Sequence, residues 1–260
     1  MRRALMVVLG MVLTTVGLTA PAHADAPPHQ EVYWQYFEPN GQKYQTVRVD
    51  CPAGMIATTA GADGEGYPSV SGSRSVDHGR GWELILSQIW PNRFSVQVVC
   101  WSGLSNLTTL TTWADVKAGA VGATYNVCPG GAQRFLGGGA YTTDPAMTPK
   151  NFVSYSNSGW QASFRNTTAA TQRIFVQVLC ADGLTGLRWQ STRGEHITDD
   201  SIAILRCPDG TEVVSAGALG PQVDFVYTHG RDERGSSYSV IGAEMEGDDT
   251  FFQARVLCAF

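Results

Sequence analysis

Six cysteines divide the chain into three similar units, and this repeat constrains the fold more than any other feature. The first cysteine of each unit is followed by proline and, two residues later, by glycine: Cys51, Cys128 and Cys207. The second cysteine of each unit ends a run in which apolar residues alternate: Cys100, Cys180 and Cys258. A repeat of this length indicates one supersecondary unit used three times. We predict units over residues 30–105, 106–183 and 184–260.

Within a unit the apolar residues recur at every second position. Val47 and Val49 alternate with Arg48 and Asp50, which is the pattern of a half-buried strand. Proline and glycine after the first cysteine are typical of a turn. The segment from Trp113 to Ala120 comes closest to a helix, but its glycine favours strand and loop. We expect an all-β fold of antiparallel strands, with about five or six strands per unit.

A glycine between two small residues follows the first cysteine of every unit, at 60–62, 137–139 and 216–218. Such glycines weaken a strand unless another backbone must come close. Their recurrence predicts a prism-like or propeller-like body in which the units pack around a pseudo-threefold axis. The alternative is a row of three small β-sandwiches. The short linkers at 102–110 and 181–187 favour the single body.

The first 24 residues have the pattern of a signal peptide. Arg2 and Arg3 precede an uncharged stretch at 4–20, and Ala22-His23-Ala24 places small residues at a cleavage site. The stretch is short for a membrane anchor. We therefore expect a secreted, extracellular product that does not insert into a membrane.

Export places the cysteines in an oxidising compartment, where thiols form disulfides. Pairing within each unit joins Cys51 to Cys100, Cys128 to Cys180 and Cys207 to Cys258. Both cysteines of a unit end a strand, so this pairing requires the two strands to run the same way, either as neighbours or across two layers. The rival arrangement instead links neighbouring units: Cys100 with Cys128, Cys180 with Cys207, and Cys51 with Cys258.

Tryptophans recur with the repeat. The position-matched ones are Trp34, Trp113, Trp189, Trp82 and Trp160. Large aromatic rings at matched positions are typical of a repeated core, so we expect these to be buried rather than to stack on sugars. The unmatched aromatic residues are better candidates for ligand contact: Trp90, Trp101, Tyr67, Tyr141, Tyr155 and Tyr227.

A His-Gly-Arg sequence precedes Trp82 in the first unit and Tyr238 in the third. Loops on a repeated scaffold are where binding residues usually lie. The candidate ligand-binding residues at these positions and their counterparts in the second unit are His78, Arg80, Tyr155, Asn157, Tyr227, His229 and Arg231. An Asp beside His78 can orient the imidazole as a general base. In a glycine-rich turn, however, we expect these side chains to be solvated hairpin residues rather than catalytic ones.

No known catalytic or nucleotide-binding motif is present, and we predict no cofactor. Carboxylates cluster late in the third unit, at Glu244, Glu246, Asp248 and Asp249. These form a weak calcium candidate, and we favour a solvated turn. The net charge of −5 gives no basic surface for nucleic acid.

The combination of Cys-Pro-x-Gly, small-Gly-small, Gly-Trp and an alternating run ending in cysteine resembles a repeat of secreted actinobacterial proteins and some phage tail proteins. The likeness covers nearly all of the chain after the signal segment. It implies a bacterial, secreted repeat protein and no assigned activity. Unit three departs from it with Tyr238 in place of tryptophan, and unit one lacks the triple glycine.

These observations favour a non-catalytic secreted protein that binds glycans or a cell surface through its loop tips, as a lectin does. One alternative is an inhibitor or modulator that binds another extracellular protein. Another is a hydrolase that uses carboxylates of the third unit.

Overall fold

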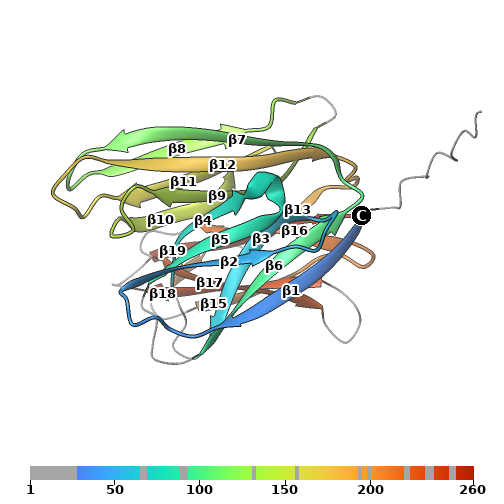
Figure 1. Cartoon of the computed structure of the whole chain (residues 1–260), viewed down its shortest axis with the longest axis horizontal. Coiled ribbons are helices and arrows are strands. Elements are labelled where there is room, and N and C mark those ends of the chain that lie inside the picture. Colours follow the sequence, from blue (N-terminus) through green and yellow to red (C-terminus); the bar gives the residue numbers. More distant parts are fainter. Residues whose placement is uncertain are drawn as a thin grey trace, which may run out of the picture.

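In the computed structural model, strands make up most of the described chain (Figure 1). The structure describes residues 28–64, 69–87, 93–130, 133–155, 158–192, 195–197, 201–219, 223–231, 237–245 and 250–260. The structure describes the backbone but not the side chains of residues 153–155, 195–197, 201–202, 219, 223–231, 237–245 and 250–252. The one helical turn in these ranges is a 3₁₀ turn, η1 (Asp77–Gly79).

The first unit contributes six strands: β1 (His29–Phe37), β2 (Tyr44–Asp50), β3 (Ile56–Gly64), β4 (Ser69–Val76), β5 (Gly81–Ser87) and β6 (Phe94–Ser102). The second contributes β7 (Ser105–Val116), β8 (Val121–Val127), β9 (Arg134–Thr142), β10 (Thr148–Tyr155), β11 (Gly159–Arg165) and β12 (Gln172–Asp182). The third contributes β13 (Arg188–Ser191), β14 (Glu195–Ile197), β15 (Ser201–Arg206), β16 (Glu212–Leu219), β17 (Val223–Arg231), β18 (Ser237–Met245) and β19 (Thr250–Ala259).

Each unit divides its strands between two antiparallel half-sheets in the same way. In the first unit, β6 pairs with β1 and β3, while β5 pairs with β2 and β4. In the second unit, β12 pairs with β7 and β9, while β11 pairs with β8 and β10. The third unit repeats this order, with β13 and β14 sharing the place of a single strand beside β19.

The half-sheets continue from one unit into the next. Ser73 of β4 pairs with Ala140 of β9, which forms sheet I in the order β2-β5-β4-β9-β12-β7. Phe152 of β10 pairs with Ala218 of β16, which forms sheet II from β8-β11-β10 and β16-β19-β13, with β14 also on β19. At the third joint β17 lies beside β3. We refer to the two three-stranded sheets that meet there, β15-β18-β17 and β3-β6-β1, together as sheet III. Figure 1 shows sheet I from β7 at the top to β2 below.

Three composite sheets, each shared by two units, form a ring with pseudo-threefold symmetry, in which β3 and β17 lie in contact at the third joint but belong to separate hydrogen-bonded sheets. The ring confirms the all-β prism-like prediction. It excludes the row of separate sandwiches, because the first and last units contact each other directly. The indole nitrogen of buried Trp101 donates a hydrogen bond to the Val213 carbonyl oxygen over 3.2 Å.

Each disulfide lies within one unit and joins two of the sheets. Cys51 follows β2 of sheet I and bonds to Cys100 in β6 of sheet III, with 5.8 Å between their Cα atoms. The second and third bridges, Cys128–Cys180 and Cys207–Cys258, join sheets II and I and sheets III and II. The predicted in-unit pairing is confirmed, and the rival pairing between neighbouring units is wrong. The two cysteines of a bridge face each other across two layers, as strand direction requires.

The small triplets lie where the units meet. A Cβ atom added to Gly137 would stand 2.0 Å from the carbonyl oxygen of Thr58, in the first unit. One added to Gly139 would stand 2.3 Å from the carbonyl oxygen of Ser73. These distances leave no room for a side chain, which explains the glycines by close backbone approach.

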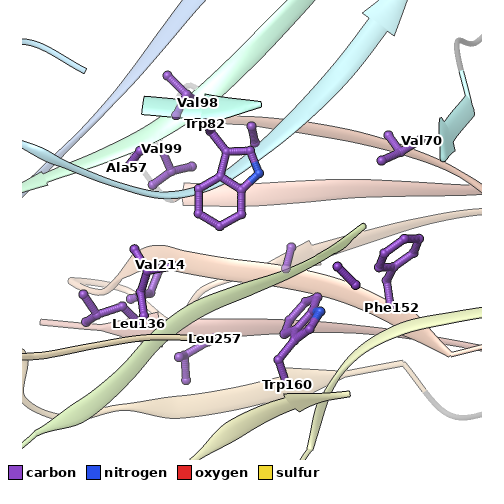
Figure 2. Packing of buried hydrophobic residues seen from close by; sticks show 14 of the residues in the cluster. Ala57, Val70, Trp82, Val98, Val99, Leu136, Phe152, Trp160, Val214 and Leu257 are labelled. Carbon is purple, nitrogen blue, oxygen red and sulfur yellow. The ribbon is translucent and has the colours of Figure 1, made fainter. Parts of the chain in front are cut away.

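The core lies between the three sheets. Figure 2 shows the rings of Trp82 and Trp160 entering it from opposite sides, with Val214 and Leu136 nearby. Both tryptophans are buried, as the repeat predicts. Gly138 gives the Trp160 ring its space, since an added Cβ would meet the indole at 2.3 Å.

The core prediction is wrong for two of the matched tryptophans. Trp34 is 60% exposed and Trp113 is 53% exposed, whereas Trp189 is half-buried. Their partners explain the difference: Trp34 pairs with Gln97, Trp113 with Phe175 and Trp189 with Leu257. These partners lie at different distances before the second cysteine, so the tryptophans occupy three different levels of the sheets. The contact prediction for Trp101 is also wrong, since it is buried.

Candidate functional site

Two predicted ligand residues, His78 and Arg80, lie at the turn between β4 and β5, and both side chains are exposed. Asp77, His78 and Gly79 have consecutive positive φ angles of 49°, 55° and 82°. The left-handed conformation costs an L-residue about 1–2 kcal/mol. The surrounding contacts therefore have to hold this turn in place.

Two contacts fix the turn. The backbone N–H of Cys51 donates to the carbonyl oxygen of Arg80 at 2.8 Å. Arg48 donates from Nη2 to the Asp77 carboxylate at 2.6 Å and from Nε to Asp50 at 2.7 Å. The Arg48 hydrogen bond lowers the pKa of Asp77 below its ordinary value, and Arg80 and His78 lower it further. The result is a charged turn, held by these hydrogen bonds, with His78 at its apex.

The remaining candidates at the corresponding hairpins are not brought together with His78 by any described contact. Tyr155 ends β10, while Tyr227, His229 and Arg231 lie along β17, where His229 pairs with Ser239. For these residues the description covers the backbone alone, and Asn157 lies outside the described residues. Trp90 and Tyr67 lie outside them as well.

The acidic candidates of the third unit are placed only in part. Glu244 lies in β18 opposite Asp224 of β17. Glu246, Asp248 and Asp249 fall outside the described residues. Within the ranges that the structure describes, no group of three or more His, Cys, Asp or Glu side chains is arranged to hold a metal ion.

An exposed site that sequence reasoning missed lies at the edge of sheet I, in the second unit. Trp113 stands on the outer face of β7, and the Arg173 guanidinium of β12 lies 3.9 Å from the centre of its ring. Arg173 also donates from Nε to Oδ1 of Asp115 at 2.8 Å. Arginine is therefore held between the indole and the carboxylate. The ring remains half exposed beside it.

Aromatic and charged side chains continue from Trp113 across the outer face of sheet I. Phe175 pairs with both Trp113 and Tyr141, and the Phe175 and Tyr141 rings stack 4.8 Å apart. The Arg74 guanidinium covers the Tyr141 ring at 4.9 Å and forms an ion pair with Glu83. Tyr141 is thus on the outer face, but its ring is already packed between neighbours. Trp113 is the member of this row with the largest exposed aromatic surface.

The signal for this site was present in the sequence. Asp115 follows Trp113 by two residues, which places the two side chains on one face of a strand, and Arg173 lies in the adjacent alternating run. The strand pairing that brings Arg173 beside Trp113 could not be read from the sequence. Because the tryptophans recur at matched positions, all of them were predicted to lie in the core, and an exposed site at Trp113 was therefore not predicted.

Comparison with known proteins gives no functional assignment: no family model matches this sequence, and no curated protein matches it significantly. In the part of the chain that the structure describes, no helix is long and apolar enough to cross a membrane.

Proposed function

We propose that this protein is a secreted, non-catalytic carbohydrate-binding protein, and that it binds glycan through the exposed face of Trp113. The observation that carries the proposal is the Trp113–Arg173–Asp115 arrangement on the outer face of sheet I. Three disulfides support export, since such bonds persist in oxidising compartments. The signal segment predicted over residues 1–24 and the bacterial origin implied by the resemblance belong to the same proposal.

The chemistry of the site suits a sugar. The face of an indole ring carries negative charge density, which attracts the polarised C–H groups on the apolar face of a pyranose. Arg173 and Asp115 provide N–H donors and carboxylate acceptors beside the ring, which matches the hydroxyl groups at the rim of a sugar. Stacking plus directional polar contacts is how small-ligand sites combine affinity with orientation.

Charge favours a neutral glycan. The chain carries a net charge of −5, which disfavours polyanionic polysaccharides at the surface. Arg173 is paired with Asp115, and Arg74 with Glu83, so the positive charges on this face are balanced locally. Among neutral glycans, β-1,4-linked glucose, N-acetylglucosamine and xylose expose flat apolar faces, because all their ring substituents are equatorial.

The same site gives no support to hydrolysis. Asp115 is engaged by Arg173, and a glycosidase needs a second carboxyl group about 5–10 Å away across the bond to be cleaved. Two other described carboxylates on this face are Asp50 of β2, which pairs with Arg48, and Glu83. Glu83 lies on β5, four strands along from β7, and pairs with Arg74.

The test is depletion of the purified protein from solution by insoluble cellulose, chitin and xylan, with Trp113→Ala as the variant. Tyr125→Ala removes another half-exposed aromatic ring of the same unit, on sheet II, and serves as the matched control. We expect at least about tenfold weaker retention of W113A and unchanged retention of Y125A. Equal retention of W113A and the wild type would contradict the site, and no retention of wild type on any of the three would contradict the function.

The predicted loop-tip contact at His78 and Arg80 is a separate part of this proposal. Its support is the left-handed turn, which is held by hydrogen bonds and presents both side chains to solvent. His78→Ala in the same depletion experiment distinguishes a contribution of this turn from one of the sheet face.

A further inference from the structure

The first unit contains a second copy of the aromatic, arginine and carboxylate arrangement. On the outer side of β1, the Arg93 guanidinium lies 4.1 Å from the centre of the Tyr36 ring. Arg93 Nε also lies 3.5 Å from Oε1 of Glu38. Tyr36 is 49% exposed, and both charged side chains are exposed.

The two copies occupy equivalent places in their units. Tyr36 pairs with Ser95 and Trp113 pairs with Phe175, and both partners lie five residues before the second cysteine of the unit. Glu38 follows Tyr36 by two residues, as Asp115 follows Trp113. The pseudo-threefold relation of the units therefore relates the sites as well.

The arginine occupies the same position in the first and second units, but the third unit has a different residue there. Arg93 and Arg173 each lie seven residues before the second cysteine, and the same place in the third unit is Phe251. The third unit therefore lacks the guanidinium that the other two units place there. Among the residues that the structure describes, the arrangement occurs in two copies.

Isolated surface ion pairs and exposed cation–π contacts each contribute little to stability. Folding alone gives no strong reason to keep a half-exposed ring, an arginine and a carboxylate together in two units. Ligand binding supplies one, because the arginine and carboxylate hold each other and the ring in a fixed orientation before the ligand arrives.

We propose that the protein is bivalent, with one site for a neutral β-1,4-linked oligosaccharide at Trp113, Arg173 and Asp115 and another at Tyr36, Arg93 and Glu38. The proposal rests on the proposed carbohydrate-binding function and adds the second site and the stoichiometry. The first-unit site extends over Trp34, whose ring lies 4.9 Å from Tyr36 at an angle of 84° and is the most exposed tryptophan described.

The two sites lie on different composite sheets. Trp113 is on edge strand β7 of sheet I, and Tyr36 is on edge strand β1 of sheet III. Each site can therefore hold its own chain, and the protein links two chains or two particles. Linked sites raise the affinity for a polymer surface by about 10²–10⁴ over one site, which is why loss of Trp113 alone reduces retention on an insoluble polysaccharide.

The test uses soluble hexasaccharides of β-1,4-linked glucose and of β-1,4-linked N-acetylglucosamine, titrated into the full protein by calorimetry. We expect two molecules bound per wild-type chain, and one per chain for Trp113→Ala and for the double variant Trp34→Ala/Tyr36→Ala. The combined triple variant binds none, and Tyr125→Ala binds two. All substituted residues are exposed, and near-ultraviolet circular dichroism with free-thiol titration verifies that each variant is folded and disulfide-bonded.

A second measurement follows the light scattering of suspended cellulose or chitin nanoparticles. Wild type aggregates the particles, whereas either single-site variant coats them without aggregation. One hexasaccharide per wild-type chain, lost completely in W113A, would overturn bivalency and leave the proposed function intact. No binding of either hexasaccharide, with a protein captured instead through the same aromatic residues, would overturn both.

Discussion

Thr58 of the first unit donates a hydrogen bond from Oγ1 to the carbonyl oxygen of Val214 in the third unit, over 2.5 Å and across 156 residues of sequence. Thr58 is fully buried. Its backbone carbonyl also lies where a side chain on Gly137 of the second unit would stand. One residue thus contacts both other units close to the pseudo-threefold axis.

Replacing Thr58 with valine keeps the volume and removes the donor. We expect the free energy of unfolding to fall by about 1–3 kcal/mol, because a buried carbonyl oxygen loses a partner. Thr46→Val, at an exposed position of β2, is the control and should change stability by less than about 0.5 kcal/mol. Guanidinium denaturation of the oxidised protein measures both. Equal stability of the two variants would show that this contact does not hold the units together.

Gly137→Ala should destabilise the protein by about 3 kcal/mol or more, because the new methyl group would meet a backbone oxygen at 2.0 Å and neither strand can withdraw. Gly72→Ala is the matched control in a strand. Its methyl group would meet the end of the flexible Ile85 side chain at 3.0 Å, so we expect a change of less than about 1 kcal/mol. Thermal unfolding compares the variants. A G137A protein as stable as G72A would contradict close packing at the axis.

The buried tryptophans Trp82 and Trp160 differ in their hydrogen bonds. Trp82 Nε1 donates to Ser73 Oγ at 2.7 Å, whereas Trp160 Nε1 has no partner among the described residues. Substitution with phenylalanine removes similar volume at both sites. We expect Trp82→Phe to cost about 1 kcal/mol more than Trp160→Phe, because only the former breaks a hydrogen bond, which joins a buried indole to a half-buried hydroxyl.

Ser73→Ala is the companion variant for this comparison. It should account for much of the Trp82→Phe penalty and should leave the effect of Trp160→Phe unchanged. Equilibrium denaturation supplies all three values. A Trp160→Phe penalty as large as that of Trp82→Phe would indicate that the Trp160 nitrogen is satisfied in solution.

The carboxyl group of Asp77 should titrate below the ordinary aspartate value of about 3.9, because Arg48 donates a hydrogen bond to it. A folded-state pKa below the unfolded one means that this contact stabilises the turn above the unfolded pKa. That contribution is lost as pH falls through the folded pKa. The carboxyl carbon shift of Asp77, followed by NMR from pH 6 downward, measures the midpoint.

Arg48→Gln should return the Asp77 midpoint toward the ordinary value and loosen the turn that presents His78. Arg74→Gln removes an arginine that pairs with Glu83 instead, so it should leave Asp77 unchanged. An Asp77 midpoint that does not move in R48Q would show that Arg48 does not hold the turn.

The pattern of cysteines and alternating residues was sufficient to predict the fold class, and it favoured the in-unit disulfides over the pairing between neighbouring units. Both cysteines of a unit end a strand, and adjacent antiparallel strands end at opposite edges of a sheet, so strand direction excludes a bridge between such neighbours. The structure has each bridge crossing between two sheets. The glycine triplets predicted close packing at a shared axis for the same reason that the structure shows: an added Cβ would collide with a backbone. Local rules on turns, strands and glycine apply wherever the chain lies, which is why they could be read from the sequence.

The candidate site could not be predicted from these local patterns. Trp34 and Trp113 were assigned to the core because they match in the repeat, and both are exposed. Exposure depends on the level at which each residue meets the neighbouring strand, and a shift of two residues keeps the same face but changes the neighbours. The contact of Trp113 with Arg173 depends on the pairing of β7 with β12, which no local pattern specifies.

Strand periodicity and turn residues are local properties, so the amino-acid pattern was enough to predict a threefold-repeated all-β chain and to favour in-unit disulfides. The sharing of each sheet by neighbouring units, the contact between the first and third units, and the meeting of aromatic, arginine and carboxylate groups on two outer faces became visible in the tertiary structure. Those features arise from strand pairing between segments far apart in the chain, where packing and register select one partner among many.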